Sequence, residues 1–145
     1  MPNPPVPAGA PGLPVASIAD LIEALRLSRE AALRARGACE DAFAAVEARH
    51  PWPPAEAGPE AAQAVVAARL EAGLAAGLAD LSRAAADAEW QEHLHATALL
   101  DARPGSVDEL RRKLEAVRPV RIFKAAIGAY ELRDLCHLAE LEVAP

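Results

Sequence analysis

Aromatic residues make up only 3% of this 145-residue chain, and cysteine occurs only twice. Hydrophobic residues still account for 52% of the sequence, because alanine is by far the most frequent of them. Alanine favours helices but brings little apolar surface to bury, so the composition predicts helices around a thin core. Chains of this kind often bury further surface against a partner, as the helices of coiled coils and bundles do.

The signatures of common catalytic and cofactor sites are also missing. The sequence has no P-loop, no GxGxxG or GxSxG, no HExxH and no CxxC. It has no apolar run long enough for a transmembrane helix and no basic segment followed by an apolar stretch that would mark a signal peptide. We therefore expect a non-enzymatic cytoplasmic protein without a cofactor and without membrane contact. Cys39 and Cys136 lie in helical patterns, and we expect both to be buried as small hydrophobic residues.

The N-terminal segment differs from the rest of the chain. Residues 1–14 are rich in proline and carry no charged side chain. Proline lacks the backbone donor that a helix needs, so we predict an extended, disordered tail over residues 1–16. Residues 17–145 are predicted to form a single helical domain.

The first predicted helix covers residues 18–49. Ser17, followed three residues later by Asp20, is close to the capping-box pattern, and Pro51 ends the helical stretch. Apolar or small residues recur every seven positions and form a seam that is about 48 Å long at the helical rise. The seam residues are Ile18, Leu25, Ala32, Cys39 and Val46.

The second predicted helix is long and covers residues 59–102. Pro59 suits the first helical position, and no breaker follows before Pro104. Gly73 and Gly77 favour close packing of this helix against a neighbour. A second seam shifts near Trp90 and otherwise consists of Leu70, Leu74, Gly77, Leu81, Ala84 and Ala88.

Two shorter helices are predicted to complete the chain. Ser106 and Glu109 fit a capping box that begins a helix over 107–117, and Pro119 separates it from a helix over 120–142. The predicted fold is therefore all-α. It is an elongated helical bundle, or a coiled-coil-like hairpin of two long helices, with the two shorter helices at its C-terminal end.

Two acid–histidine pairs have a spacing that metal sites use. Glu92 and His95, and likewise Asp134 and His137, are three residues apart and share a helix face. Two such pairs with further carboxylates build the di-metal sites of four-helix bundles. Aspartate is shorter than the glutamate of that pattern, and the helix over 18–49 offers no marked ligands. Exposed polar residues are the simpler interpretation.

Cations gather between residues 111 and 124, while residues 59–102 carry mostly acidic charges. The first interpretation is that these cations pair with acids of the second helix or of a partner protein. Phosphate contact is one alternative, although the helix over 120–142 is mostly apolar after its first turn and suits base reading poorly. A solvated face is the other. The cations of interest are Arg111, Arg112, Arg118, Arg121 and Lys124.

These patterns favour an interaction, adaptor or small assembly protein that acts by helix–helix packing with a protein partner or a second copy. Leu70, Leu74, Leu81 and Trp90 would supply the apolar contact area, and the 111–124 cations would steer acidic partners. A nucleic-acid-associated protein that uses the same cations is one alternative. A metal-binding four-helix bundle is the other.

Overall fold

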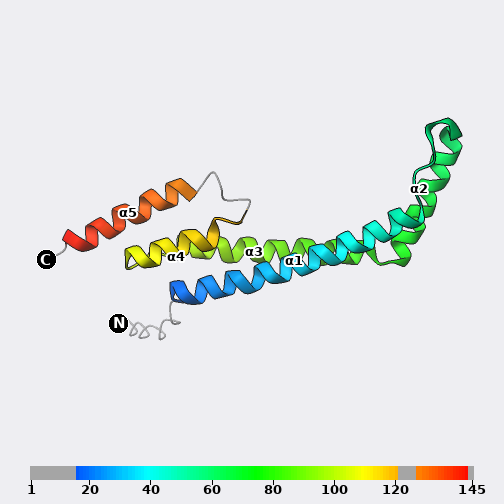
Figure 1. Ribbon diagram of the computed structural model, residues 1–145. Coiled ribbons are helices and arrows are strands. Elements are labelled where there is room, and N and C mark those ends of the chain that lie inside the picture. The colour runs from blue at the N-terminus through cyan, green and yellow to red at the C-terminus, as the bar shows by residue number, and fades with distance from the viewer. Residues whose placement is uncertain (1–15, 121–126, 144–145) are drawn as a thin grey trace, which may run out of the picture.

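The computed structural model describes residues 16–120 and 127–143 (Figure 1). The chain is all-α over these residues, as the sequence predicts, and they contain no strand. The elements are α1 (Ile18–Arg49), η1 (Ala55–Ala57), α2 (Gly58–Ala75), α3 (Leu78–Asp101), α4 (Val107–Val117) and α5 (Ile127–Val143).

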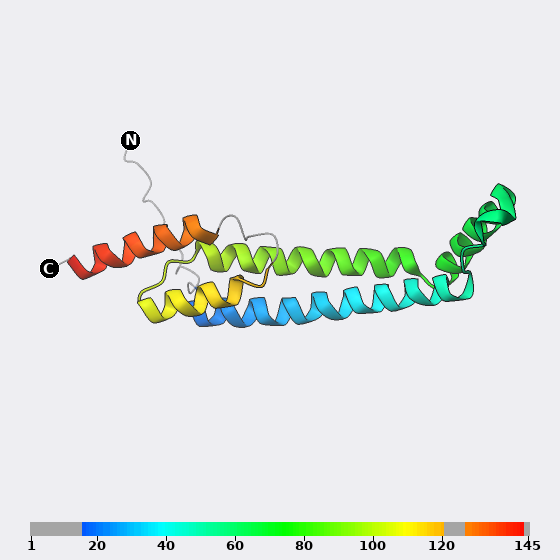
Figure 2. The same ribbon diagram turned by 45° about the horizontal axis from the view of Figure 1, so that its top comes forward.

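The longest helices, α1 and α3, run side by side in opposite directions and form the body of the molecule (Figures 1 and 2). At one end α2 turns away from this hairpin, and at the other end α4 and α5 flank it. The molecule is therefore elongated, with different helices at its two ends. Among the described residues, no helix is both long and apolar enough to cross a membrane.

Helix α1 has the bounds that the sequence predicts. The Ser17 hydroxyl accepts a hydrogen bond from the Asp20 amide at 3.1 Å, and the Asp20 carboxylate accepts one from the Ser17 amide at 3.1 Å. This reciprocal capping box satisfies two helix-end donors. The heptad seam is buried at Ile18, Leu25, Ala32 and Val46 and half-buried at Cys39.

The prediction of one long helix over residues 59–102 is wrong, because the chain forms two helices there. Gly77 separates α2 from α3 and has φ 69°, in the left-handed region that favours glycine. Gly73 packs tightly at this corner, since a Cβ on it would lie 3.1 Å from Leu78 Cδ1. The predicted close packing therefore occurs between the two halves of the expected helix.

The hydrophobic core lies mainly at the α4–α5 end of the hairpin. It consists of two clusters of buried residues. The smaller cluster, Leu110, Leu114 and Leu138, joins α4 to α5, and Ile127 packs against both clusters. Along the hairpin, buried positions such as Ser28 and Ala32 are small, so α1 and α3 bury little apolar surface there. The larger cluster consists of Ile18, Leu25, Ala96, Leu99, Leu100, Val117 and Val120.

The C-terminal helices differ from the prediction in two details. The Ser106 hydroxyl accepts from the Glu109 amide at 3.2 Å, but the Glu109 carboxylate accepts from the Gly105 amide, so the predicted reciprocal box is only half formed. Val120, the expected first residue of the last helix, is buried outside any helix. Residues 121–126 and residues 1–15 of the predicted tail lie outside the described residues.

Both cysteines are free thiols, and only one of them is partly buried. Cys39 is half-buried, whereas Cys136 is exposed on α5. The expectation that both are buried is therefore wrong for Cys136.

Candidate functional site

The α2 arm, residues 58–75, presents one apolar stripe to solvent. Val66, Leu70 and Leu74 are spaced four residues apart and are 52%, 65% and 70% exposed. Residues at this spacing share a helix face. The inner face of the arm, which includes Ala72, lies against the end of α1 across a small cavity lined mainly by alanine. The stripe therefore lies on the side of α2 that faces away from the end of α1.

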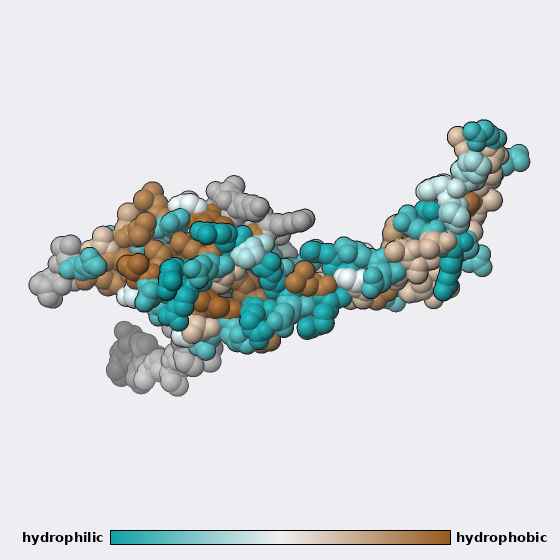
Figure 3. Space-filling view, in the orientation of Figure 1, coloured by the Kyte–Doolittle hydropathy of each residue, from teal (hydrophilic) through white to brown (hydrophobic). Residues whose placement is uncertain are grey.

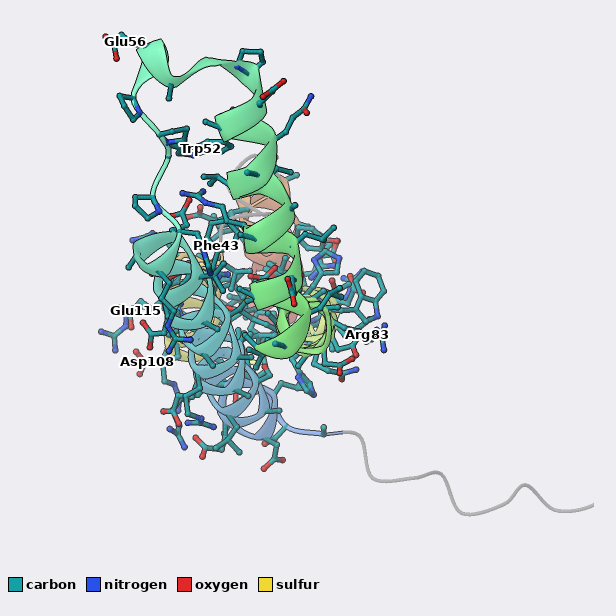
Figure 4. The ribbon with its side chains drawn as sticks, turned by 90° about the vertical axis from the view of Figure 1, so that its right-hand side faces the viewer. Phe43, Trp52, Glu56, Arg83, Asp108 and Glu115 are labelled. Atoms are coloured by element: carbon teal, nitrogen blue, oxygen red, sulfur yellow. The ribbon has the colours of Figure 1, made fainter. Side chains whose placement is uncertain are left out.

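One arginine holds the arm against the end of α1. Arg69 Nε donates to the His50 carbonyl oxygen at 2.7 Å, and Nη1 donates to Glu47 Oε1 at 3.1 Å. Its guanidinium also lies 4.6 Å from the centre of the Trp52 ring. Figure 4 looks onto this end of the molecule, with Trp52 beside α2 and Phe43 on the last turns of α1. The sequence patterns do not single out Arg69, although it is the only arginine or lysine between residues 50 and 82.

The four apolar residues predicted to bind a partner do not form one seam. Leu70 and Leu74 share the α2 stripe, whereas Leu81 and Trp90 lie on α3, beyond the turn at Gly77. Leu81 is half-buried. Trp90 is 58% exposed, and its ring stacks on His93 with ring centres 5.3 Å apart.

The predicted basic cluster is divided among several environments. Arg111 pairs with Asp108 on the same helix at 3.2 Å. Arg112 and Arg118 are exposed. Arg121 and Lys124 lie outside the described residues. None of the described cations from 111 to 120 forms an ion pair with an acid of residues 59–102. The predicted charge matching within the chain is therefore not found there, and the ion pair across the hairpin joins Arg36 to Glu89 instead.

Lys113, a neighbour of these arginines, lies at the centre of a buried ion cluster. Its Nζ donates to Asp134 Oδ2 at 2.5 Å and to the Leu100 and Ala102 carbonyl oxygens at 2.7 and 2.5 Å. Both charged side chains are completely buried. Burial lowers the pKa of Lys113 below its ordinary value, and the hydrogen bond to Asp134 opposes that shift.

Arg133 completes the buried ion cluster. Its Nε and Nη2 donate to Asp134 Oδ1 at 2.9 and 2.7 Å, and Nη2 also donates to the Leu100 carbonyl oxygen at 2.7 Å. Leu100 and Ala102 lie at the C-terminal end of α3, where carbonyl groups lack helical partners and the helix dipole favours cations. The cluster therefore caps α3 and fixes α4 and α5 to it.

The candidate metal ligands are not assembled into a site. Both carboxylate oxygens of Asp134 already accept hydrogen bonds from Lys113 and Arg133. Glu92, His95 and His137 are each half-buried. Among the residues that the structure describes, no three histidine, cysteine, aspartate or glutamate side chains come together as a metal site would require.

No family model matches this chain, and no curated protein or solved structure matches it significantly. Any functional assignment therefore depends on the chain's own residues. Within the described part of the chain, exposed apolar helix faces are the features whose chemistry suits binding.

Proposed function

We propose that this chain is a non-enzymatic helical interaction protein that holds a protein partner through the α2 arm. The observation that carries this proposal is the exposure of Leu70 and Leu74, at 65% and 70%, on a helix that turns away from the hairpin. Burying a leucine side chain contributes about 1.5–3 kcal/mol, so this stripe is costly to leave in water. A partner helix that covers the stripe recovers this free energy.

The geometry of the arm supports the same function. Arg69 ties α2 to Glu47 and His50, so the stripe is presented by a helix with one orientation rather than by a loose segment. A pre-oriented helix pays less conformational entropy on binding. The α1–α3 hairpin then acts as a spacer between the arm and the α4–α5 end (Figure 2).

The test is capture of partners by tagged protein from a lysate of its own host, with and without nuclease treatment. The variant Leu70→Gln with Leu74→Gln removes apolar area without changing charge. The matched control is Leu27→Gln with Leu33→Gln, two exposed leucines of α1. We expect specific proteins to be retained by the native chain and by the control and to be lost from the α2 variant.

Two outcomes would contradict this function. One is a set of captured proteins that is identical for the native chain and the α2 variant. The other is loss of every partner on nuclease treatment, which would favour the nucleic-acid alternative through Arg112 and Arg118. Binding of that kind weakens steeply with salt, because phosphate contacts release counterions.

A further inference from the structure

The last helix has a second apolar face, opposite the one that it buries. Gly128, Leu132, Leu135 and Ala139 follow one another at steps of four, three and four residues and are all exposed. Leu132 is 64% exposed and Leu135 is 47% exposed. The other side of α5 is buried at Asp134 and Leu138, against α4.

A helix that is apolar on opposite faces is normally buried on both of them. The outer face of α5, defined by Gly128, Leu132, Leu135 and Ala139, is instead in contact with solvent. Figure 3 shows hydrophobic residues gathered over the end of the molecule where α4 and α5 lie. Contiguous apolar surface bordered by polar residues is typical of a binding site.

The border of this face is acidic. Glu131 and Glu142 follow one edge, and Glu140 lies beyond Cys136 on the other side; all three glutamates are exposed. None of them forms an ion pair with a described residue. Arg133 lies near the same border, but its guanidinium is held by Asp134 and by the Leu100 carbonyl oxygen. The face therefore presents apolar side chains inside a negatively charged rim.

We propose that the outer face of α5 binds an amphipathic helix of a partner protein whose apolar stripe is flanked by lysine or arginine. The spacing of the stripe suits side-chain packing between two helices. The seventeen residues of α5 extend about 26 Å at the helical rise, which is long enough for several turns of contact. The acidic rim selects a basic partner, because opposite charges steer encounter and like charges reject the wrong helix.

A second copy of the chain suits this face less well. Two α5 helices in contact would bring the glutamates of both rims together, with no free cation on the described border to offset them. An anionic lipid surface is disfavoured for the same reason. The outer face of α5 and the α2 arm lie at opposite ends of the hairpin (Figure 1), so this proposal does not depend on the function proposed for the arm.

The probe is a fluorescent amphipathic peptide of about 18 residues, five helical turns, with leucine on one face and lysine on the other. Its counterpart has glutamate in place of lysine. Fluorescence anisotropy with the full chain measures binding. We expect the lysine peptide to bind and the glutamate peptide to bind at least about tenfold more weakly.

Two sets of variants locate the binding site. Leu132→Gln with Leu135→Gln should weaken lysine-peptide binding at least about tenfold, whereas Leu27→Gln with Leu33→Gln should leave it unchanged. Replacing Glu131, Glu140 and Glu142 with glutamine should weaken it about threefold or more and reduce its salt dependence. The same replacement of Glu56, Glu60 and Glu71 removes equal charge from the α2 end and should have little effect. Far-UV circular dichroism establishes that each variant is folded.

Several results would overturn the proposal. Equal binding of the two peptides would remove the role of the acidic rim, and equal loss in both pairs of leucine variants would remove the role of α5. The face would be assigned to a second copy if the native chain sediments as a dimer and the variant Leu132→Gln with Leu135→Gln sediments as a monomer. Capture on vesicles of phosphatidylcholine and phosphatidylglycerol through the same leucines would assign it to lipid. The α2 variant Leu70→Gln with Leu74→Gln should bind the lysine peptide normally, which separates this test from that of the proposed function.

Discussion

Replacing Asp134 with asparagine should destabilise the protein more than replacing its buried partner Lys113 with methionine. In Asp134→Asn, Lys113 keeps two carbonyl acceptors but loses its counterion, with the Arg133 cation close by. Breaking a buried ion pair from one side costs about 3–5 kcal/mol. In Lys113→Met, Asp134 keeps both hydrogen bonds from Arg133, and Leu100 keeps its Arg133 donor. The Ala102 carbonyl and Asp134 Oδ2 lose their donor, but Arg133 still pairs with the carboxylate, so the cost should be about 1–3 kcal/mol.

Urea unfolding followed by circular dichroism measures both free energies of unfolding, and hydrogen exchange over residues 127–143 shows whether α5 opens first. The double variant Lys113→Met with Asp134→Leu should cost less than Asp134→Asn, because it leaves no buried charge and Arg133 is exposed enough to turn to solvent. Arg111→Met, which breaks an exposed pair, should cost less than about 1 kcal/mol. A smaller effect of Asp134→Asn than of Lys113→Met would refute this account of the ion cluster.

The same lysine predicts a dependence of stability on pH. Burial lowers the pKa of Lys113 below 10.5 in the folded chain, so the unfolded chain binds that proton more tightly. Between the lowered pKa and 10.5, this group makes the free energy of unfolding rise with pH. Comparison of urea midpoints of the native chain and Lys113→Met across this range isolates the effect. An identical pH dependence in the two proteins would contradict it.

Two further predictions concern the helix ends. Gly77→Ala should lower the free energy of unfolding by about 1–2 kcal/mol, because an alanine disfavours the left-handed conformation at φ 69°. Gly37→Ala, inside α1 with open space around the added Cβ, should instead raise it by about 0.5–1 kcal/mol. Equal urea midpoints for these two variants would contradict the strain at Gly77. Ser17→Ala should cost about 1 kcal/mol through loss of the cap. The Ser17 hydrogen bond holds the pKa of Asp20 below 3.8, so its stabilisation is present above that pH and is lost as the pH falls through the lowered pKa. Acid titrations should therefore show a weaker loss of stability in Ser17→Ala, and an unchanged acid profile would contradict this.

Helix bounds were predictable wherever neighbouring residues alone specify them. Ser17 with Asp20 begins α1, Gly58 with Pro59 begins α2, and Ser106 begins α4, because caps and proline act over three or four residues. The heptad seam of α1 was predictable for the same reason, since helical periodicity places Ile18 and Leu25 on one face.

The break at Gly77 was not predictable from local pattern. Glycine is tolerated within a helix at a cost of about 1 kcal/mol, so the local sequence allows either a continuous helix or a turn. Packing of Leu78 over Gly73 accompanies the turn. That turn removes Leu70 and Leu74 from the seam that Leu81 was predicted to share, and it leaves them on a separate arm.

The sequence by itself therefore determined the class of fold, the ends of most helices and the apolar faces that they carry, because these follow from interactions within a few residues. The tertiary structure alone decided which of those faces are covered. It buried Lys113 with Asp134, 21 residues further along the chain, although both side chains look like surface charges in the sequence. It also left Leu70, Leu74, Leu132 and Leu135 exposed. The physical reason is that burial depends on which helices meet in space, and helical periodicity carries no information about the partner.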